Sequence, residues 1–338
     1  PETQAVSGET SKTAGNETSK NSTDKTTAAS SETSETTKAT ESSTTEAATE
    51  PVTHGNQGSY TPTHSDPKVQ YYRESVEIAD GWPGTSDSTN YVIKVNVDWN
   101  VMTVYDGDTP VLAFPCSTAR EGYITPCDTY YTGSWYFGDT GWCYMADGTY
   151  GQYAYSLHRA SDDLYDGYMI HTVCYYTPDR SDLETYEYNK LGGTASMGCI
   201  RLCVGDARWV MTHVGPGSTV IVYSDPSSPG PLGKPSSMFI PPEVTEICSW
   251  DPTDPVSANP WHSYDLDLLA PDKIEVAKGA SFSATDYLQV MDCYGYDLTQ
   301  YVYTSGSVDT ATPGSYTVNA SVSIGPIYAS KDIEVVVK

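Results

Sequence analysis

The first fifty residues restrict what this chain can fold into more than any other part of the sequence. They contain 23 Ser or Thr residues, and Val6 is the only Val, Ile, Leu, Met or Phe among them. A segment of this composition cannot bury enough apolar surface to offset the conformational entropy that folding removes. We therefore predict that residues 1–66 form a disordered Ser/Thr/Glu-rich stalk, and that folded structure begins after it.

The chain is also strongly acidic. Its 338 residues include 44 Asp and Glu against 18 Lys and Arg, which gives a formal net charge of -26. This balance argues against a nucleic-acid partner, because phosphate binding depends on Lys and Arg. No run of apolar residues approaches the length of about 18 that a membrane-spanning helix requires, so we expect no membrane-spanning segment.

Short runs of alternating apolar and polar residues follow the stalk. This period-two pattern, rich in Tyr and β-branched residues, is typical of half-buried strands. We predict strands over residues 92–97, 101–105 and 111–116, and one short helix near residues 206–215 with Asp206 as its N-cap. The sequence thus predicts a mainly β protein, with the first folded domain over residues 67–224.

Nine prolines occur between Pro226 and Pro260. Proline fixes φ and lacks a backbone donor, so residues 225–264 are predicted to be an extended Pro-rich linker. Alternation returns in residues 315–323 and 333–337, and residues 265–338 are predicted to form a small β-sandwich.

Eight cysteines are present, and none forms a C-x-x-C pair or matches a zinc-ligand spacing, so we expect no structural metal. Cys199 differs from the others in its neighbours. Gly198 permits a sharp turn before it, and Arg201 places a cation two residues beyond it. His171, at the end of a predicted strand, is a candidate base for the thiol. On the residues alone, the alternative interpretation is a buried structural cysteine beside a surface arginine.

The chain from about residue 90 to residue 224 resembles the L,D-transpeptidase catalytic domain, also called YkuD-like. The resemblance covers a first hairpin, a Ser-Thr segment with a Thr-Pro pair, a strand ending in His-Thr, the stretch around the cysteine, and the last strand; these are residues 91–105, 116–119, 125–126, 168–173, 191–202, 206–209 and 217–220. Residues 268–338 are similar to bacterial immunoglobulin-like modules of surface proteins.

The resemblance implies a YkuD-like β-sandwich, an Ig-like module and a role for each residue of the motif. Cys199 is expected to be the nucleophile, His171 its base, and the carbonyl of Thr172 the group that orients the imidazole. The backbone N–H groups of Met197, Gly198 and Cys199 are expected to hold the oxyanion, and Arg201 and Ser196 to position the substrate. No cofactor or metal is implied, because the thiol performs the covalent chemistry.

Two departures from the family pattern stand out. Met197 replaces the usual His before the Gly-Cys pair, and Cys127-Asp128 replaces the Gly that often follows the Thr-Pro pair. The long acidic segment between His171 and Cys199 is either a lid over the cleft or a variable surface loop.

Three further expectations concern individual residues. A disulfide between Cys174 and Cys203 is favoured over one between Cys199 and Cys203, which would silence the enzyme until it is reduced. His158 is expected to be a surface or structural residue rather than part of the cleft, and His213 a structural one.

The implied function is a peptidoglycan L,D-transpeptidase that crosslinks stem peptides through a cysteine thioester and is acylated by carbapenem-type β-lactams. Two alternatives stay open at this point. One is an L,D-carboxypeptidase in which water is the acceptor, and the other is a catalytically silent adhesion protein of the cell surface. All three are bacterial and extracellular, either secreted or associated with the cell wall.

Overall fold

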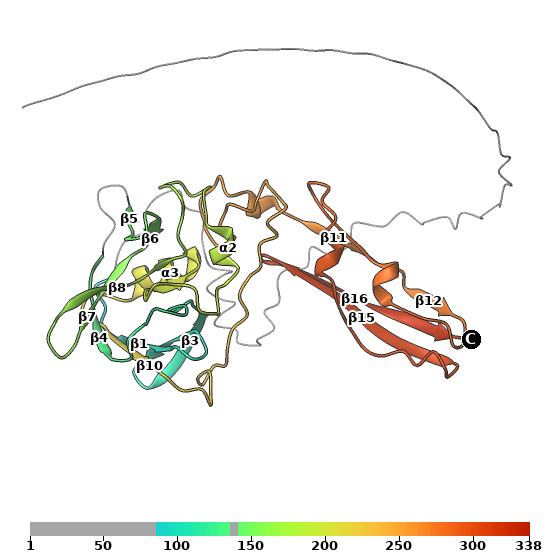
Figure 1. Cartoon of the computed structure of the whole chain (residues 1–338), viewed down its shortest axis with the longest axis horizontal. Coiled ribbons are helices and arrows are strands. Elements are labelled where there is room, and N and C mark those ends of the chain that lie inside the picture. Colours follow the sequence, from blue (N-terminus) through green and yellow to red (C-terminus); the bar gives the residue numbers. More distant parts are fainter. Residues whose placement is uncertain (1–85, 136–140) are drawn as a thin grey trace, which may run out of the picture. The chain divides into compact units, whose positions relative to one another are not determined.

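The computed structural model describes residues 86–135 and 141–338. The predicted stalk over residues 1–66 lies outside the described residues, as do residues 67–85 of the predicted catalytic domain. The expectation of a mainly β protein is confirmed, with one large sheet before the Pro-rich segment and smaller sheets after it (Figure 1).

The large sheet has eight strands in the order β3-β2-β1-β10-β4-β7-β8-β9. Its strands are β1 (Tyr91–Asn96), β2 (Val101–Asp106), β3 (Thr109–Pro115), β4 (Thr129–Trp135), β7 (Tyr155–Arg159), β8 (Tyr165–Thr172), β9 (Ile200–Leu202) and β10 (Thr219–Tyr223). A separate hairpin pairs β5 (Trp142–Tyr144) with β6 (Tyr150–Gln152). Two helices accompany them, α2 (Thr185–Tyr188) and α3 (Val204–His213).

Alternation in the sequence explains how the first strands pack. Ile93 and Val95 of β1 are fully buried, as period two requires of a strand with one face on a core. In β2 all of residues 101–104 are buried, so this strand is covered on both faces. Burying side chains of this size stabilises the fold by about 1.5–3 kcal/mol each.

The eight-stranded sheet nearly closes into a barrel. Its two edge strands are β3 and β9, and the chain just after β3 reaches β9 through Ser117 and Arg201. The N–H of each of these residues donates to the carbonyl of the other at 2.9 Å. This bridge satisfies backbone groups that an open edge would leave exposed.

Strands β8 and β9 are parallel, which explains the long segment between the two candidate catalytic residues. Parallel neighbours cannot be joined by a tight turn and need a crossover of a dozen or more residues. Residues 173–199 are that crossover, and α2 lies within it.

Helix α3 differs from its prediction at its N-terminus. The helix begins at Val204 and its N-cap position is Cys203, which makes no side-chain cap hydrogen bond. The predicted cap, Asp206, is therefore wrong; it is a buried residue inside the first turn. The helix N-terminus is capped instead by side chains of the Pro-rich segment, as described below.

The Pro-rich segment contains no regular strand or helix before the 3-10 helix η1 (Pro260–Ser263), in agreement with its prolines. It is nevertheless packed rather than free. Several of its side chains are buried in the main hydrophobic core: Met238, Ile240, Val244, Ile247 and Trp261.

The C-terminal region has a four-stranded sheet in the order β12-β16-β15-β14 and a two-stranded sheet of β11 and β13. These strands are β11 (Leu266–Leu269), β12 (Lys273–Val276), β13 (Gln289–Asp292), β14 (Tyr303–Ser305), β15 (Gly314–Ile324) and β16 (Ile327–Val337), with 3-10 helices η2 (Ala284–Tyr287) and η3 (Thr299–Tyr301). Val318, Ala320 and Val322 of β15 are buried on one face, as their alternation predicts.

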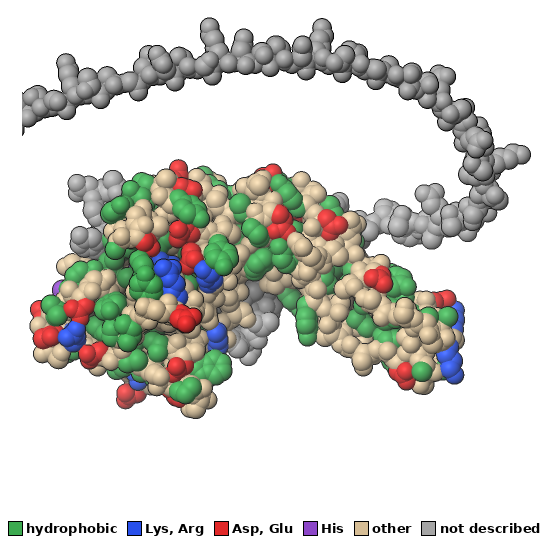
Figure 2. Space-filling model, viewed as in Figure 1, with side chains coloured by type: hydrophobic (Ala, Val, Ile, Leu, Met, Phe, Trp, Pro, Cys, Tyr) green, Lys and Arg blue, Asp and Glu red, His purple; other side chains and the backbone are tan. Residues whose placement is uncertain are grey.

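Acidic side chains are scattered over the face of the molecule shown in Figure 2, and they do not gather into one patch. This distribution fits a net charge that is spread along the chain. Within the described ranges, no helix has both the length and the apolar character needed to cross a membrane.

Candidate active site

His171 lies near the C-terminal end of β8 and is almost completely buried, with 1% of its surface exposed. Its Nδ1 atom is 2.6 Å from the carbonyl oxygen of Thr172. A carbonyl only accepts hydrogen bonds, so Nδ1 carries the proton and Nε2 retains its lone pair. Burial, followed by the charge of Arg201, lowers the pKa of His171 to about 3. The imidazole is therefore neutral at physiological pH, as a base must be before it accepts a proton.

The register between β8 and β9 determines which side chains share a face. His171 is paired with Arg201 across these parallel strands, and Ile170 with Ile200. Cys199 directly precedes β9, and its thiol lies 3.8 Å from the carbonyl oxygen of Gly167 in β8. The fold thus brings Cys199 beside the strand that carries His171, although the two residues are 28 positions apart in the sequence.

The turn before the cysteine is built around Gly198. Its φ is +135°, a conformation that residues with a Cβ atom rarely adopt. A Cβ atom there would lie 2.5 Å from the ring of Tyr168 and 2.8 Å from the carbonyl oxygen of Ile124. The glycine is therefore required both by the backbone conformation and by the close approach of its neighbours.

Ser196 stabilises this turn through two hydrogen bonds of its side chain. Its side chain is fully buried, and its hydroxyl donates to the Cys199 carbonyl at 2.6 Å and accepts from the Gly198 N–H at 3.0 Å. Of the three N–H groups expected at the oxyanion, that of Gly198 is thus already engaged by Ser196. The contacts of Ser196 are those of a residue that shapes the turn, whereas the sequence predicted a substrate contact.

The Cys199 thiol is partly buried. Burial raises its pKa above the usual 9.0, although a backbone hydrogen bond and the charge of Arg201 act in the opposite direction. The neutral imidazole and the protonated thiol therefore form the resting state. Thiolate must be generated by proton transfer during the reaction, because a preformed thiolate–imidazolium pair would require the opposite shift of both pKa values.

Arg201 is 5% exposed, and its guanidinium is paired with two carboxylates. Its Nη1 lies 3.2 Å from Glu187 Oε2 in α2, and its Nη2 lies 3.7 Å from Asp147 Oδ2 in the turn of the β5–β6 hairpin. Glu187 also binds the ammonium of Lys190 at 2.6 Å. A substrate carboxylate would therefore have to compete with these partners for the guanidinium.

Sulfur-containing and small residues pack against Cys199 on the side of the β5–β6 hairpin. Cys199 packs against a cluster of Cys143, Met145, Ala154, Met169 and Cys174. All eight cysteines of the chain are free thiols, so neither the favoured Cys174–Cys203 disulfide nor the Cys199–Cys203 alternative is formed. Cys174 belongs to the cluster beside Cys199, whereas Cys203 belongs to the main core.

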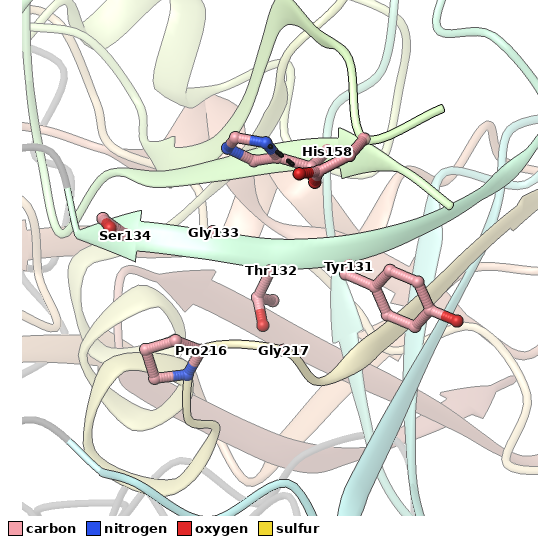
Figure 3. Close-up of a pocket in the computed structure, with 8 residues that line it drawn as sticks. Tyr131, Thr132, Gly133, Ser134, His158, Pro216 and Gly217 are labelled. Carbon is pink, nitrogen blue, oxygen red and sulfur yellow. Dashed lines mark ion pairs between the residues drawn. The ribbon is translucent and has the colours of Figure 1, made fainter. Parts of the chain in front are cut away.

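His158 lies in a different place from these residues. It lines a pocket with Tyr131, Gly133 and Pro216, and none of the lining residues belongs to the Cys199 site (Figure 3). Its ring stacks on Tyr165 and its Nδ1 lies 3.5 Å from an oxygen of Asp163. Its contacts are those of a partly exposed structural histidine.

His213 is stacked on the Trp209 ring one turn earlier in α3, with ring centroids 4.3 Å apart. Within the described part of the chain, no three His, Cys, Asp or Glu side chains are grouped so that they could hold a metal ion.

Three residues of the site were not singled out as functional from the sequence. Asp147 and Glu187 pair with Arg201, and the Thr125 hydroxyl donates to the Gly198 carbonyl at 2.9 Å. The Thr-Pro pair was visible in the sequence, but a short pattern of this kind does not indicate which distant residue its side chain will reach.

Comparison with known proteins places both folded regions in families. Residues 90–222 match the L,D-transpeptidase catalytic domain, YkuD. Residues 266–324 match the Ig-like domain of bacterial surface proteins. No curated protein sequence matches the chain.

Similar solved structures include an L,D-transpeptidase from Mycobacterium smegmatis, with 17% identity, 40% of this chain and 59% of that chain covered, and a TM-score of 0.31. The L,D-transpeptidase LdtMt1 in complex with imipenem has 19% identity, the same coverage of both chains and a TM-score of 0.31. L,D-transpeptidase 3 from Mycobacterium tuberculosis has 22% identity, with 40% of this chain and 61% of that chain covered and a TM-score of 0.29.

The chain spans about three-fifths of the length of these proteins, and the TM-scores are low, so the assignment rests on the two domain matches. Through residues 90–222 the chain belongs to the YkuD family of L,D-transpeptidase catalytic domains, and it carries a C-terminal bacterial Ig-like domain.

Proposed function

We propose that this protein is a peptidoglycan L,D-transpeptidase that acts through a thioester on Cys199. The observation that carries the proposal is the arrangement of His171 next to the strand of the cysteine. The imidazole is neutral, its Nδ1–H is held by the Thr172 carbonyl at 2.6 Å, and Nε2 is left as the base. These features support the assignment of His171 as the base and of the Thr172 carbonyl as its orienting group in acyl transfer to Cys199.

In the proposed reaction, Nε2 of His171 takes the thiol proton as the sulfur attacks the carbonyl carbon of a stem peptide. The tetrahedral oxyanion is held by the N–H groups of Met197 and Cys199, joined by that of Gly198 if Ser196 releases it. The terminal D-alanine leaves with the proton from His171, and the thioester remains. An amine from a second stem then attacks the thioester and gives its proton to His171. The new amide bond is the crosslink, and the Cys199 sulfur leaves and takes the proton back from His171.

The low pKa of His171 has a consequence for this sequence of steps. An imidazolium in a buried site beside Arg201 is unfavourable, so the proton passes quickly to the leaving amine. Arg201, held by Glu187 and Asp147, supports the negative charge that develops on the sulfur. The Ig-like domain is consistent with work at the bacterial cell surface.

The test is intact-mass analysis after incubation with imipenem, a carbapenem that is bound in the solved LdtMt1 structure. We expect one covalent adduct on the wild-type chain and none on Cys199→Ala, with unchanged far-UV circular dichroism. An adduct on the alanine variant, or no adduct on the wild type, would contradict the proposal.

Incubation with donor and acceptor stem peptides then separates the possible activities. Crosslinked product supports the transpeptidase. Shortened donor peptide alone indicates a carboxypeptidase with water as acceptor, and an absence of both products indicates a silent surface protein.

A further inference from the structure

The Pro-rich segment lies along the crossover that joins the two candidate catalytic residues. Five contacts link the Pro-rich segment to the crossover. The two segments are antiparallel, because residues later in the Pro-rich segment contact residues earlier in the crossover. The contacts are Lys234 Nζ to Gly192 O at 2.6 Å, a paired contact of Asn189 with Ile240, Thr185 Oγ1 to Cys248 O, Leu183 N to Ser249 O at 2.9 Å, and Arg180 Nη1 to Asp254 Oδ1 at 2.5 Å. We call residues 234–254 the strap. In Figure 1 this part of the chain runs past α2.

Asn189, at the C-cap of α2, makes the most specific of these contacts. Its Nδ2 donates to the Ile240 carbonyl at 2.7 Å, and its Oδ1 accepts from the Ile240 N–H at 2.8 Å. Ile240 itself is fully buried. One side chain thus satisfies both backbone groups of a buried residue that lies in no strand or helix.

The far end of the strap is fixed by a buried ion pair. The Asp254 carboxylate is fully buried, and the Arg180 side chain is 17% exposed. A buried charge is costly unless it is paired, so these two groups specify one position of the strap against the crossover.

Two further strap residues hold the N-terminus of α3, directly after the strand of the nucleophile. Asp251 accepts from the Val204 N–H at 2.7 Å, and Thr253 accepts from the Gly205 N–H at 2.8 Å. These are orphan donors that a helix start must satisfy. The strap therefore contacts both segments that flank Cys199.

Between the strap and the nucleophile stands α2. Its Glu187 binds Arg201 at 3.2 Å, and Arg201 in β9 is two residues from Cys199 and close enough for its charge to act on the thiol. The position of α2 therefore determines where the guanidinium is held relative to the sulfur.

We propose that the strap positions Arg201 beside Cys199 by fixing α2, with Asn189 as its central positioning residue. The inference rests on the proposed acyl transfer at Cys199. It also assigns the strap to the catalytic domain, whereas the sequence predicts that this domain ends at residue 224. The minimal active fragment accordingly includes the strap.

The test is a double-mutant cycle on the rate of acylation by imipenem in the full chain. Asn189→Ala removes both strap hydrogen bonds, and Glu187→Gln weakens the link to Arg201. We expect each single variant to slow acylation about tenfold, as the loss of one or two hydrogen bonds of about 0.5–1.5 kcal/mol predicts. The double variant is expected to be no slower than the slower single variant, because both changes break the same connection.

Asn96→Ala is the matched control. Asn96 also fixes the Pro-rich segment, through Nδ2 contacts to the carbonyls of Asp225 and Ser228 at 3.0 and 2.9 Å, but upstream of the strap. It is expected to lower the melting temperature while leaving the acylation rate of the folded protein unchanged. If Asn189→Ala does not fold, Thr185→Val removes one strap contact with little change in shape and is expected to slow acylation about threefold, on the scale of one weak hydrogen bond.

The outcomes are distinct. Wild-type acylation by a folded strap variant, or rate losses that multiply in the double variant, would overturn the role of the strap. Failure of the wild-type protein to form a Cys199 adduct would overturn the proposed function instead.

Discussion

The Nδ1 atom of His171 donates to the carbonyl oxygen of the next residue in the chain, Thr172, over 2.6 Å. The base is thus oriented by a backbone group, which cannot be removed by substitution of a side chain. In the proposed mechanism the Cys199 thiol depends on this imidazole, because burial raises the pKa of the thiol above 9.0. Loss of the base should therefore leave a nucleophile that is almost fully protonated at neutral pH.

For His171→Gln we expect imipenem acylation at neutral pH to fall by about 10²–10⁴, the range typical of a lost general base. The residual rate should increase with pH as the Cys199 thiol ionises. Quenching the reaction at set times and measuring the adduct by mass spectrometry across a pH series gives both the rate at neutral pH and its increase with pH. An unchanged rate at neutral pH would remove His171 from the mechanism.

Alkylation of Cys199 should report the resting protonation state. Because burial raises the pKa of the thiol and lowers that of His171 to about 3, iodoacetamide should react slowly at neutral pH and faster only in the alkaline range. Peptide-resolved mass spectrometry separates Cys199 from the other seven cysteines. Rapid alkylation at mildly acidic pH would instead reveal a thiolate–imidazolium pair.

Gly198→Ala should disable the site through backbone strain and crowding. The new Cβ atom would meet Tyr168 at 2.5 Å and Ile124 at 2.8 Å, at a φ of +135°. We expect acylation to fall at least about a hundredfold, as a misplacement of about 1 Å produces, and the free energy of unfolding to fall by about 1–3 kcal/mol.

Gly122→Ala is the control for that variant. Gly122 also has a positive φ, of +86°, but no atom lies within 4 Å of the position of its Cβ. It should show the cost of the conformation without the collisions and retain acylation. Equal loss of activity in both variants would mean that crowding at Gly198 is not the cause.

Asp251 should make stability depend on pH. Burial raises its pKa to about 7, above the value of about 3.9 for an unfolded aspartate. The folded state then binds more protons than the unfolded state between these values, so the contribution of Asp251 to stability decreases as pH rises from about 4 to about 7 and is constant above that range.

Urea unfolding of the wild type and Asp251→Asn from about pH 5 to about pH 8 tests this linkage. The stability of the wild type relative to the variant should fall with rising pH. The opposite slope, or a constant difference, would show that Asp251 does not titrate in this way.

Local pattern was sufficient for much of the fold. Alternation of apolar residues predicted the strands at residues 92–97, 101–105 and 315–323, because a strand with one buried face requires period two. The arrangement of Gly198, Cys199 and Arg201 indicated a candidate reactive loop, and its reactivity stays a prediction. Proline content predicted a segment without strands or α-helices over residues 225–264, and the structure has only the 3-10 helix η1 (Pro260–Ser263) within it.

Contacts between distant segments could not be predicted in this way. The sequence assigned Asp206 as the cap of α3, whereas the caps are Asp251 and Thr253, more than forty residues away in the chain. Propensity describes a residue and its immediate neighbours, and it carries no information about which distant side chain will reach a helix end.

The sequence by itself determined several of the strands and indicated the candidate reactive residues, since both depend on short-range pattern. The tertiary structure alone decided that β8 and β9 lie parallel with Cys199 beside β8, that two carboxylates hold Arg201, and that the Pro-rich segment binds α2. Each of these results from strand register and from the pairing of buried polar groups. Strand register and polar pairing are fixed only when the whole core forms, because the free-energy cost of an unpaired buried group depends on its burial and on the partners around it.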